Sequence, residues 1–270
     1  MKKQFLSLCM VLAMVLVPAA TLAQTELTIL AAASLTDALT EIGELYQLSH
    51  PDVKPIFSFA ASGALQTQIE QGAPCDLFVS AAQKQMDALE EQNLLDADSR
   101  IDLLENKVVL IVPKGKEAPA SFETIGDAPV IAIGEPGSVP VGQYSMEIFD
   151  ALGLTEALTA EEGKLINAKD VREVLTYVAT GNVDAGIVYA TDAMTEENVT
   201  VMAQAPEGSH KPVIYPAAVI TASAQSESAK DFLAFLTTPS VSEVFSKYGF
   251  TALAALEDAP EATPETAPQK

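Results

Sequence analysis

The 270-residue chain has no tryptophan, and aromatic residues make up only 6% of it. Large stacking surfaces of the kind that bind sugars or nucleobases are therefore not expected. Basic residues are also scarce, because 15 lysines and arginines stand against 37 aspartates and glutamates, which gives a net charge of −22. Nucleic acids and anionic membranes are bound by clustered Lys and Arg, so this balance excludes both as partners. At first sight it also argues against a small anionic ligand.

Histidine and cysteine, the usual residues of nucleophilic catalysis and of zinc sites, number two each. His50 and His210 lie far in sequence from the segments singled out below. A serine nucleophile needs a neighbouring base, and a zinc site needs several ligands, so neither chemistry is supported. We expect no catalytic residues and no cofactor. Cys75 precedes an apolar run at 77–79, which is typical of a buried, unreactive thiol.

The first residues have the three-part pattern of a secretory signal peptide. Lys2 and Lys3 precede an apolar run at 5–17, and the segment 21–23 supplies small residues before a cleavage point. The run is shorter than the roughly 20 residues that a membrane span needs. We expect cleavage after about Ala23, so that residues 1–23 are removed and the net charge falls to −24.

Apolar runs and amphipathic stretches alternate along the rest of the chain. Strands are predicted at 27–31, 53–59 and 77–79 with helices between them, and this order favours a parallel, doubly wound sheet. A second α/β unit begins after a break near Leu103, with strands at 107–112, 129–133, 185–189, 199–203 and 213–221. The closing helices, at 226–236 and 240–248, fit either unit. Residues 254–270, rich in Ala, Pro and Glu, are predicted to be a disordered tail.

Ligands of an open α/β sheet bind at the carboxyl ends of its strands, where helices begin. That rule selects five segments, at 33–35, 61–63, 140–142, 170–172 and 188–190. Ser34 and Ser62 lie in two successive strand-to-helix loops of one unit. Each serine either caps its helix or, with the free amides of the helix start, holds an anion. The pattern leaves both interpretations open.

The remaining segments also have two interpretations each. The stretch 134–142 is rich in Gly and Pro, so it forms either a long turn or a loop whose amides approach a ligand closely. Tyr189 ends an apolar strand, and its hydroxyl is either bonded within the core or faces a ligand. Arg172 lies in the first turn of a helix, where the dipole disfavours a cation. It pairs with Asp170 or Glu173, or with the opposite domain.

These segments, together with others in the same order, resemble the periplasmic molybdate-binding proteins of ABC transporters, a branch of the type II periplasmic binding fold. The matching stretches are 31–36, 59–62, 72–74, 76–80, 139–142, 170–172, 186–189 and 247–250. The resemblance implies two doubly wound α/β domains joined by a hinge that the chain crosses twice. It places domain I at 25–104 and 216–253, and domain II at 105–215.

In that family two serines, two backbone amides and one tyrosine hydroxyl hold the oxyanion. By position, the corresponding groups here are the side chains of Ser34, Ser62 and Tyr189 and the amides of Val141 and Val171. The metal of the ligand, molybdenum, is then held as molybdate through its oxygens, with no direct protein–metal bond. The chain departs from the family at Ala82, where Asp is common, and in the tail after Phe250.

The resemblance implies a monomeric, periplasmic solute-binding protein that is not an enzyme and delivers molybdate or tungstate to a membrane permease. Both anions are fully deprotonated near pH 7, so hydroxyl and amide donors suit them, whereas phosphate keeps a proton and prefers an acceptor. The acidic surface does not exclude such a ligand, since the five contacts are neutral and distant charges are screened over about 8 Å. Two alternatives stay open, namely a binding protein for another oxyanion or small ligand and a secreted enzyme on the same fold.

Overall fold

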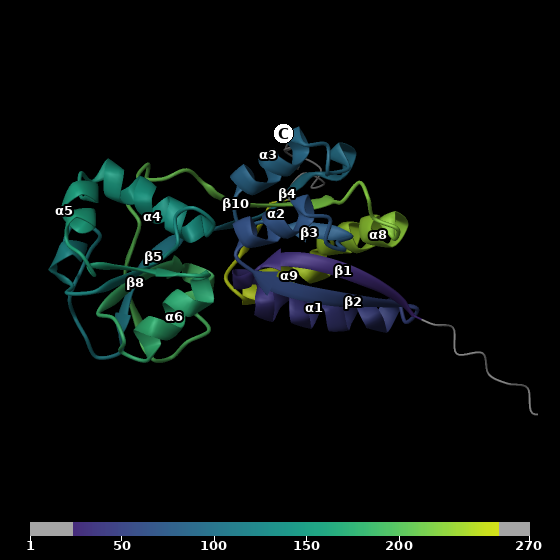
Figure 1. Cartoon of the computed structure of the whole chain (residues 1–270). Coiled ribbons are helices and arrows are strands. Elements are labelled where there is room, and N and C mark those ends of the chain that lie inside the picture. Colours follow the sequence, from purple (N-terminus) through teal and green to yellow (C-terminus); the bar gives the residue numbers. More distant parts are fainter. Residues whose placement is uncertain (1–23, 254–270) are drawn as a thin grey trace, which may run out of the picture.

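The computed structural model describes residues 24–253, which form two α/β bodies lying side by side (Figure 1). Each body is built on its own β-sheet. The signal peptide predicted at 1–23 and the tail predicted at 254–270 lie outside the described residues. Within 24–253, every helix is too short or too polar to cross a membrane.

The first sheet has six strands in the order β11-β4-β10-β3-β1-β2. Their bounds are β1 (Thr25–Ala32), β2 (Val53–Ala60), β3 (Leu77–Val79), β4 (Ile101–Asn106), β10 (Val213–Val219) and β11 (Thr251–Ala252). β1 pairs in parallel with β2 and β3, as the β-α-β-α-β order predicts. β10 is antiparallel to β3 and β4, so the complete sheet is mixed. A late segment of the chain thus returns to the first body.

Helices cover both faces of this sheet. The two groups are α1 (Thr36–Ser49), α8 (Ser226–Leu236) and α9 (Pro239–Lys247) on one face, and α2 (Ser62–Glu70) and α3 (Gln83–Glu91) on the other. Two short 3-10 helices, η1 (Ala33–Leu35) and η2 (Ala97–Ser99), complete the body. Neighbouring residues of β1 point to opposite faces, and Ile29 and Leu30 accordingly join different apolar clusters. The continuous apolar run of β1 is explained by this burial on both sides.

The second sheet has five strands in the order β7-β6-β8-β5-β9. Its elements are β5 (Val108–Pro113), η3 (Ile125–Asp127), β6 (Ile131–Gly134), α4 (Pro140–Ala151), α5 (Thr155–Ala160), β7 (Leu165–Ala168), α6 (Val171–Ala179), β8 (Ala185–Tyr189), α7 (Ala190–Ala193) and β9 (Val199–Gln204). β6 is parallel to β7 and β8, and β5 is antiparallel to β8 and β9. Figure 1 shows α4 and α6 on opposite sides of these strands. The two mixed sheets with their helices confirm the predicted α/β class.

The chain passes between the sheets twice. Lys107 alone separates β4 from β5, and residues 205–212 join β9 to β10. Leu103, where the sequence pattern changes, lies inside β4, which continues to Asn106. Leu103 and Leu104 are both buried, so this strand stays part of the first sheet. The domain bounds inferred from the resemblance stay a prediction.

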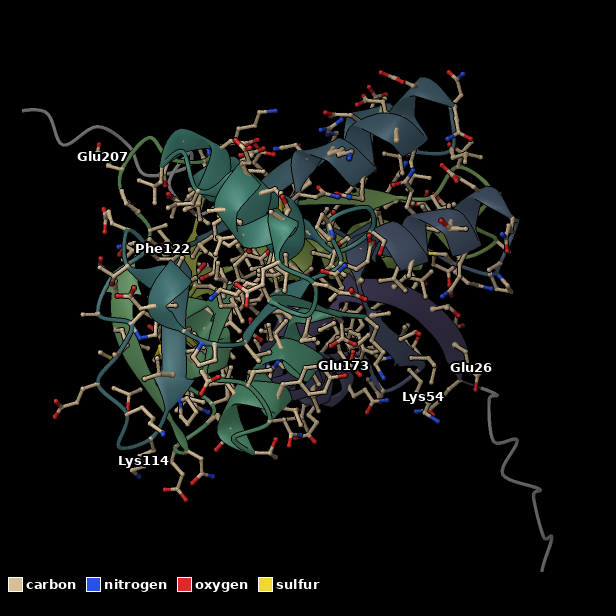
Figure 2. All side chains as sticks on the ribbon, turned by 60° about the vertical axis from the view of Figure 1, so that its left-hand side comes forward. Glu26, Lys54, Lys114, Phe122, Glu173 and Glu207 are labelled. Carbon is tan, nitrogen blue, oxygen red and sulfur yellow. The ribbon has the colours of Figure 1, made fainter. Side chains whose placement is uncertain are left out.

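Most charged side chains lie on the outside of both bodies, with Asp76, Lys164 and Asp192 among the buried exceptions. Glu26 and Lys54 project from the first body and Lys114 and Glu207 from the second, whereas Phe122 is buried (Figure 2). Exposed charges of both signs thus lie far from the interior, and the chemistry of a ligand site has to be judged from its own lining.

Candidate functional site

All five residues implied by the resemblance line one cavity between the two bodies. Its volume is only about 10 Å³ in this closed arrangement. Two of the residues come from the first body and three from the second, and they are Ser34, Ser62, Val141, Val171 and Tyr189. Each is at most 4% exposed. A cavity of this size has room for about one water-sized group, whereas pockets for drug-sized ligands measure about 300–1,000 Å³, so a ligand of that class does not fit.

Three helices begin at the cavity, α2 at Ser62, α4 at Pro140 and α6 at Val171. The first amides of a helix have no acceptor within it and carry the positive end of its dipole. Val141 is the second residue of α4 and Val171 the first of α6, so both amides belong to this set. An anion in the cavity therefore meets helix starts from both bodies.

The local sequence explains how α4 and α6 are seated there. Pro140 occupies the first helical position, where its missing N–H costs nothing. A Cβ on Gly142 would lie 2.0 Å from the carbonyl oxygen of Gly134, so only glycine lets α4 approach the end of β6. Asp170 caps α6 and accepts the N–H of Glu173 at 2.9 Å. Asp170 also lines the cavity, with its Oδ1 engaged by the helix.

Ser62 is oriented by the backbone of a neighbouring loop. It is the first residue of α2, and its Oγ accepts the N–H of Ala81 at 2.9 Å. The capping interpretation of this serine is wrong, since no side chain caps α2. Because a backbone N–H can only donate, the hydroxyl proton of Ser62 remains available to a ligand.

Ser34 lies in η1 and is held from behind by a residue that the sequence did not indicate. Its Oγ is 2.8 Å from the hydroxyl of Tyr215, which lies 181 residues further along the chain in β10. The capping interpretation fails here too, because neither η1 nor α1 has a side-chain cap. No local signal points to Tyr215, since only the return of β10 to the first sheet brings it there.

The Tyr189 hydroxyl has no hydrogen-bond partner among residues 24–253, although Tyr189 is only 1% exposed and lines the cavity. Burial, followed by the proximity of Tyr215 and other groups, raises the pKa of Tyr189 well above its ordinary value. The hydroxyl therefore keeps its proton. A buried hydroxyl without a partner costs about 1–3 kcal/mol, and this one is an available donor at the cavity.

Arg172 joins the two bodies beside the cavity. Its Nη2 donates to Asp37 Oδ2 at 2.7 Å and to the carbonyl oxygen of Ser34 at 3.4 Å, both in the first body. Of the alternatives left open by the sequence, the opposite domain is the one found. Within its own body, Arg172 Nε lies 2.7 Å from Asp192 Oδ1. Burial raises the pKa of Asp192 to about 7, although Arg172 acts in the opposite direction.

A second contact between the bodies joins α2 to the loop before α4. The N–H of Gly63 donates to the carbonyl oxygen of Ser138 at 2.9 Å. A Cβ on Gly63 would lie 2.4 Å from that oxygen, so the approach requires glycine. The structure is thus closed over the cavity by direct contacts between the two bodies.

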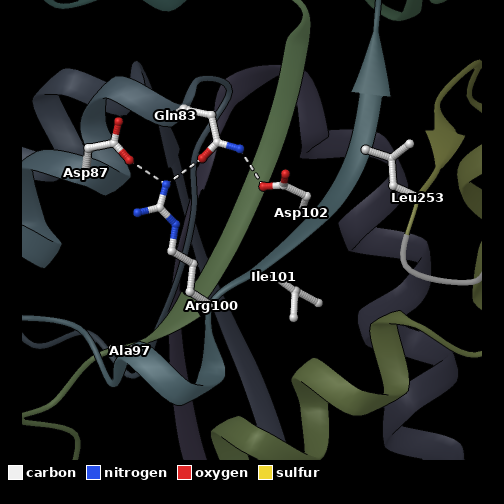
Figure 3. A pocket seen from close by; sticks show the side chains of 7 residues that line it. All are labelled: Gln83, Asp87, Ala97, Arg100, Ile101, Asp102 and Leu253. Carbon is white, nitrogen blue, oxygen red and sulfur yellow. Dashed lines mark hydrogen bonds and ion pairs between the residues drawn. The ribbon is translucent and has the colours of Figure 1, made fainter. Parts of the chain in front are cut away.

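A more open pocket lies on the first body, around Arg100 (Figure 3). Arg100 donates to Asp87 and Gln83 there and is also paired with Glu90, so its charge is already neutralised. Gln83 in turn donates to Asp102. Because its one cation is already paired and Asp87 and Asp102 also line it, this pocket is a poor anion site.

Histidine and cysteine take no part in the cavity. His50 stacks on Tyr46 and pairs with Asp231, and neither His50 nor His210 is among the lining residues. Cys75 is buried, and burial raises the pKa of its thiol to about 12. In the described part of the chain, no group of three or more His, Cys, Asp or Glu could hold a metal ion.

Two α/β bodies that are connected twice and close over a cavity of hydrogen-bond donors define a two-lobed ligand-binding protein. The chain belongs to the bacterial extracellular solute-binding protein family, whose pattern matches residues 27–251. This match confirms the solute-binding family expected from the resemblance.

Known relatives fall in the same group. The molybdate-binding protein ModA of Haemophilus influenzae is 37% identical over 238 residues, which cover 85% of this chain and 91% of the relative. A Bacillus subtilis chain assigned as an ABC transporter substrate-binding lipoprotein is 40% identical over 227 residues, with 84% and 86% covered. A solved Clostridium difficile domain assigned to a molybdenum ABC transporter has a TM-score of 0.66 at 41% identity, covering 85% of this chain and all of that domain. The predicted resemblance to molybdate-binding proteins is confirmed.

Proposed function

We propose that this protein binds molybdate or tungstate in the cavity between its two bodies and serves as the substrate-binding component of an ABC transporter. The observation that carries the proposal is the convergence of neutral donors from both bodies on one buried cavity. The 37% identity to a molybdate-binding relative supports the choice of anion.

The proposed contacts are the hydroxyls of Ser34, Ser62 and Tyr189 and the amides of Val141 and Val171. Molybdate and tungstate only accept hydrogen bonds, and these groups supply donors without adding charge. Hydrogen bonds to a charged group contribute about 1.5–3 kcal/mol each. Five of them, less the costs of desolvation and closure, are enough for micromolar binding, which corresponds to about −8 kcal/mol. Molybdenum itself is reached only through its oxygens.

Binding is proposed to follow hinge closure between domain I, at 25–104 and 216–253, and domain II, at 105–215. The anion first meets the donors of one lobe, and the second lobe then adds its own. The hydrogen bond of Gly63 to Ser138 and the ion pair of Arg172 with Asp37 support this scheme, since both join the lobes beside the cavity.

The protein is proposed to be exported by its signal peptide at 1–23 and to act in the periplasm as a monomer that passes its anion to a membrane permease. We propose no catalytic role and no cofactor. Ser34 and Ser62 would need a neighbouring base to act as nucleophiles, and the only two histidines, His50 and His210, do not line the cavity.

Calorimetric titration of the mature chain with molybdate, tungstate, sulfate and phosphate tests the proposal. Micromolar or tighter binding of the first two anions is expected, with weak or no binding of the other two. Ser62→Ala should weaken molybdate binding about tenfold, the loss of one charged hydrogen bond. Ser99→Ala is the matched control, because Ser99 is also buried in the first body and accepts a backbone N–H, that of Val219 at 2.8 Å, but does not line the cavity. Absence of molybdate and tungstate binding would refute the function.

A further inference from the structure

Behind the cavity, a chain of hydrogen bonds runs from Ser34 to the first crossing between the sheets. Ser34 Oγ lies 2.8 Å from Tyr215 Oη, which accepts a hydrogen bond from Asn106 Nδ2 at 3.2 Å. The same amide nitrogen donates to Thr191 Oγ1, in the second body, at 2.9 Å. All four residues are buried, with exposures between 0% and 5%. This series of hydrogen bonds is therefore shielded from water.

A backbone amide fixes the direction of these hydrogen bonds. The N–H of Lys107 donates to Asn106 Oδ1 at 2.8 Å. A backbone N–H needs an acceptor, so the side-chain oxygen of Asn106 must face Lys107 and its nitrogen must face Tyr215. That nitrogen can only donate. Tyr215 Oη is consequently the acceptor in its bond with Asn106.

Tyr215 must in turn donate to Ser34. Burial raises the pKa of Tyr215 well above its ordinary value, so the phenol keeps its proton. Among the described residues, Ser34 Oγ is the partner left to receive that proton. The opposite assignment, in which Ser34 donates, would bury the Tyr215 proton without an acceptor, which is unfavourable. The proton of Ser34 is then available on the side of the cavity.

We propose that Asn106 and Tyr215 are positioning residues that hold Ser34 as an obligatory hydrogen-bond donor and so favour oxyanions that carry no proton. The inference rests on the proposed function. The Ser62 hydroxyl is oriented in the same way, because its Oγ already accepts the N–H of Ala81 and its own proton is left for the cavity. Hydrogen phosphate carries one proton that needs a hydrogen-bond acceptor. Both serines present a proton to the cavity, so neither offers a free acceptor.

Tyr215→Phe is the direct test, since it keeps the ring and removes only the hydroxyl. Ser34 Oγ then loses the proton that it accepts from Tyr215, so its lone pair becomes free for a protonated ligand and its hydroxyl is less firmly oriented. The Kd for molybdate should rise several-fold, by less than the roughly tenfold expected for one complete charged hydrogen bond. The ratio of the phosphate Kd to the molybdate Kd should fall. Tyr46→Phe is the matched control, because Tyr46 is equally buried in the first body but bonds Asp231, away from the cavity. It should leave both values unchanged.

A double-mutant cycle separates a role through Ser34 from a general structural role. In a Ser34→Ala background the Tyr215→Phe substitution should change molybdate binding less than twofold, because the hydroxyl it orients is already gone. If Tyr215→Phe weakens binding by the same factor with and without Ser34, the proposed relay is wrong. If Ser34→Ala binds like the wild type, or if the wild type binds neither molybdate nor tungstate, the proposed site or function is wrong instead.

Asn106→Asp should reverse the direction of the hydrogen bonds that join Asn106, Tyr215 and Ser34. It provides a second variant should Tyr215→Phe fail to fold. An aspartate oxygen facing Tyr215 accepts the phenol proton, so Ser34 donates to Tyr215 and presents a lone pair to the cavity. Molybdate affinity should fall more than in Tyr215→Phe, whereas phosphate affinity should fall less or rise. An unchanged ratio of the two affinities in Asn106→Asp overturns the proposal.

Discussion

Arg172 of α6 and Asp37 of α1 form an ion pair between the two bodies, with 2.7 Å between Nη2 and Oδ2, although 135 residues separate them in sequence. Burial lowers the pKa of Arg172, but Asp192 and Asp37 more than compensate, so the guanidinium stays charged. Arg172 is anchored in its own body by Asp192 and reaches Asp37 only where the two bodies meet.

Asp37→Asn therefore weakens a contact between the bodies and leaves each fold intact. Since the Asp37 side chain is 42% exposed, solvent screens the pair, and we expect only a two- to fivefold loss of molybdate affinity, about 0.4–1 kcal/mol. The melting temperature of the ligand-free protein should stay nearly constant. Glu41→Gln, which breaks the Lys247 pair inside the first body, is the control for calorimetry. Equal losses of affinity in the two variants would contradict the assigned role of Asp37.

The stability of the protein should depend on pH through Asp192. Burial raises the pKa of this carboxyl from 3.8 to about 7, against the influence of Arg172. The folded state thus holds a proton that the unfolded state loses, and the contribution of Asp192 is full below pH 3.8 and lost as the pH rises through 7. Its slope is at most about 1.4 kcal/mol per pH unit.

Urea unfolding of the wild type and of Asp192→Asn between pH 4 and 8 checks this dependence. The difference in unfolding free energy should shift in favour of the variant as the pH rises to 7 and become constant above it. A constant offset from the altered contact with Arg172 does not affect the slope. Parallel curves over the whole range would show that Asp192 does not titrate in this window.

Gly63→Ala should hinder closure. The new Cβ would lie 2.4 Å from the Ser138 carbonyl oxygen in the opposite body, and overpacking of this kind typically costs about 1–3 kcal/mol, or roughly 5- to 150-fold in Kd. Gly126→Ala is the control, since a Cβ there meets nothing nearer than 3.9 Å. Molybdate titration of both variants is decisive, because unchanged affinity in Gly63→Ala would mean that this contact is not needed for binding.

Ala82→Asp should stabilise the protein. Ala82 is the N-cap residue of α3, has the extended backbone of a cap and makes no side-chain bond. An aspartate there can accept a first-turn amide, which typically adds about 1 kcal/mol. Ala82→Asn should give the same sign without a charge. Chemical unfolding measures both variants, and a loss of stability in each would show that the buried site does not admit a capping side chain.

The thiol of Cys75 should resist alkylation in the native protein. Burial raises its pKa to about 12, so almost no thiolate forms at pH 8. We expect iodoacetamide to label the mature chain rapidly in urea and very slowly without it, as followed by mass spectrometry. Comparable rates under both conditions would mean that the thiol is accessible in the folded state.

Local sequence patterns predicted the parallel strands and the five loops of the cavity well, because buried strands and helix starts can be recognised from a few neighbouring residues. The apolar run of β1 and the start of α6 at Val171 are examples. The hydrogen-bond and ion-pair partners of the site residues have no such local pattern. Tyr215 reaches Ser34 from 181 residues away, and Asp37 reaches Arg172 from 135 residues away. These contacts depend on the packing of whole sheets, which a single sequence does not spell out.

The near-complete burial of the five proposed contacts also has a kinetic meaning. With each residue at most 4% exposed, an ion held among them is largely shielded from bulk water, and we expect it to exchange when the two bodies separate. Exchange and opening are then one event, and the residence time of the ion equals the waiting time for opening. The strength of the contacts decides how much ion is held, whereas the frequency of opening decides how quickly it can be handed on.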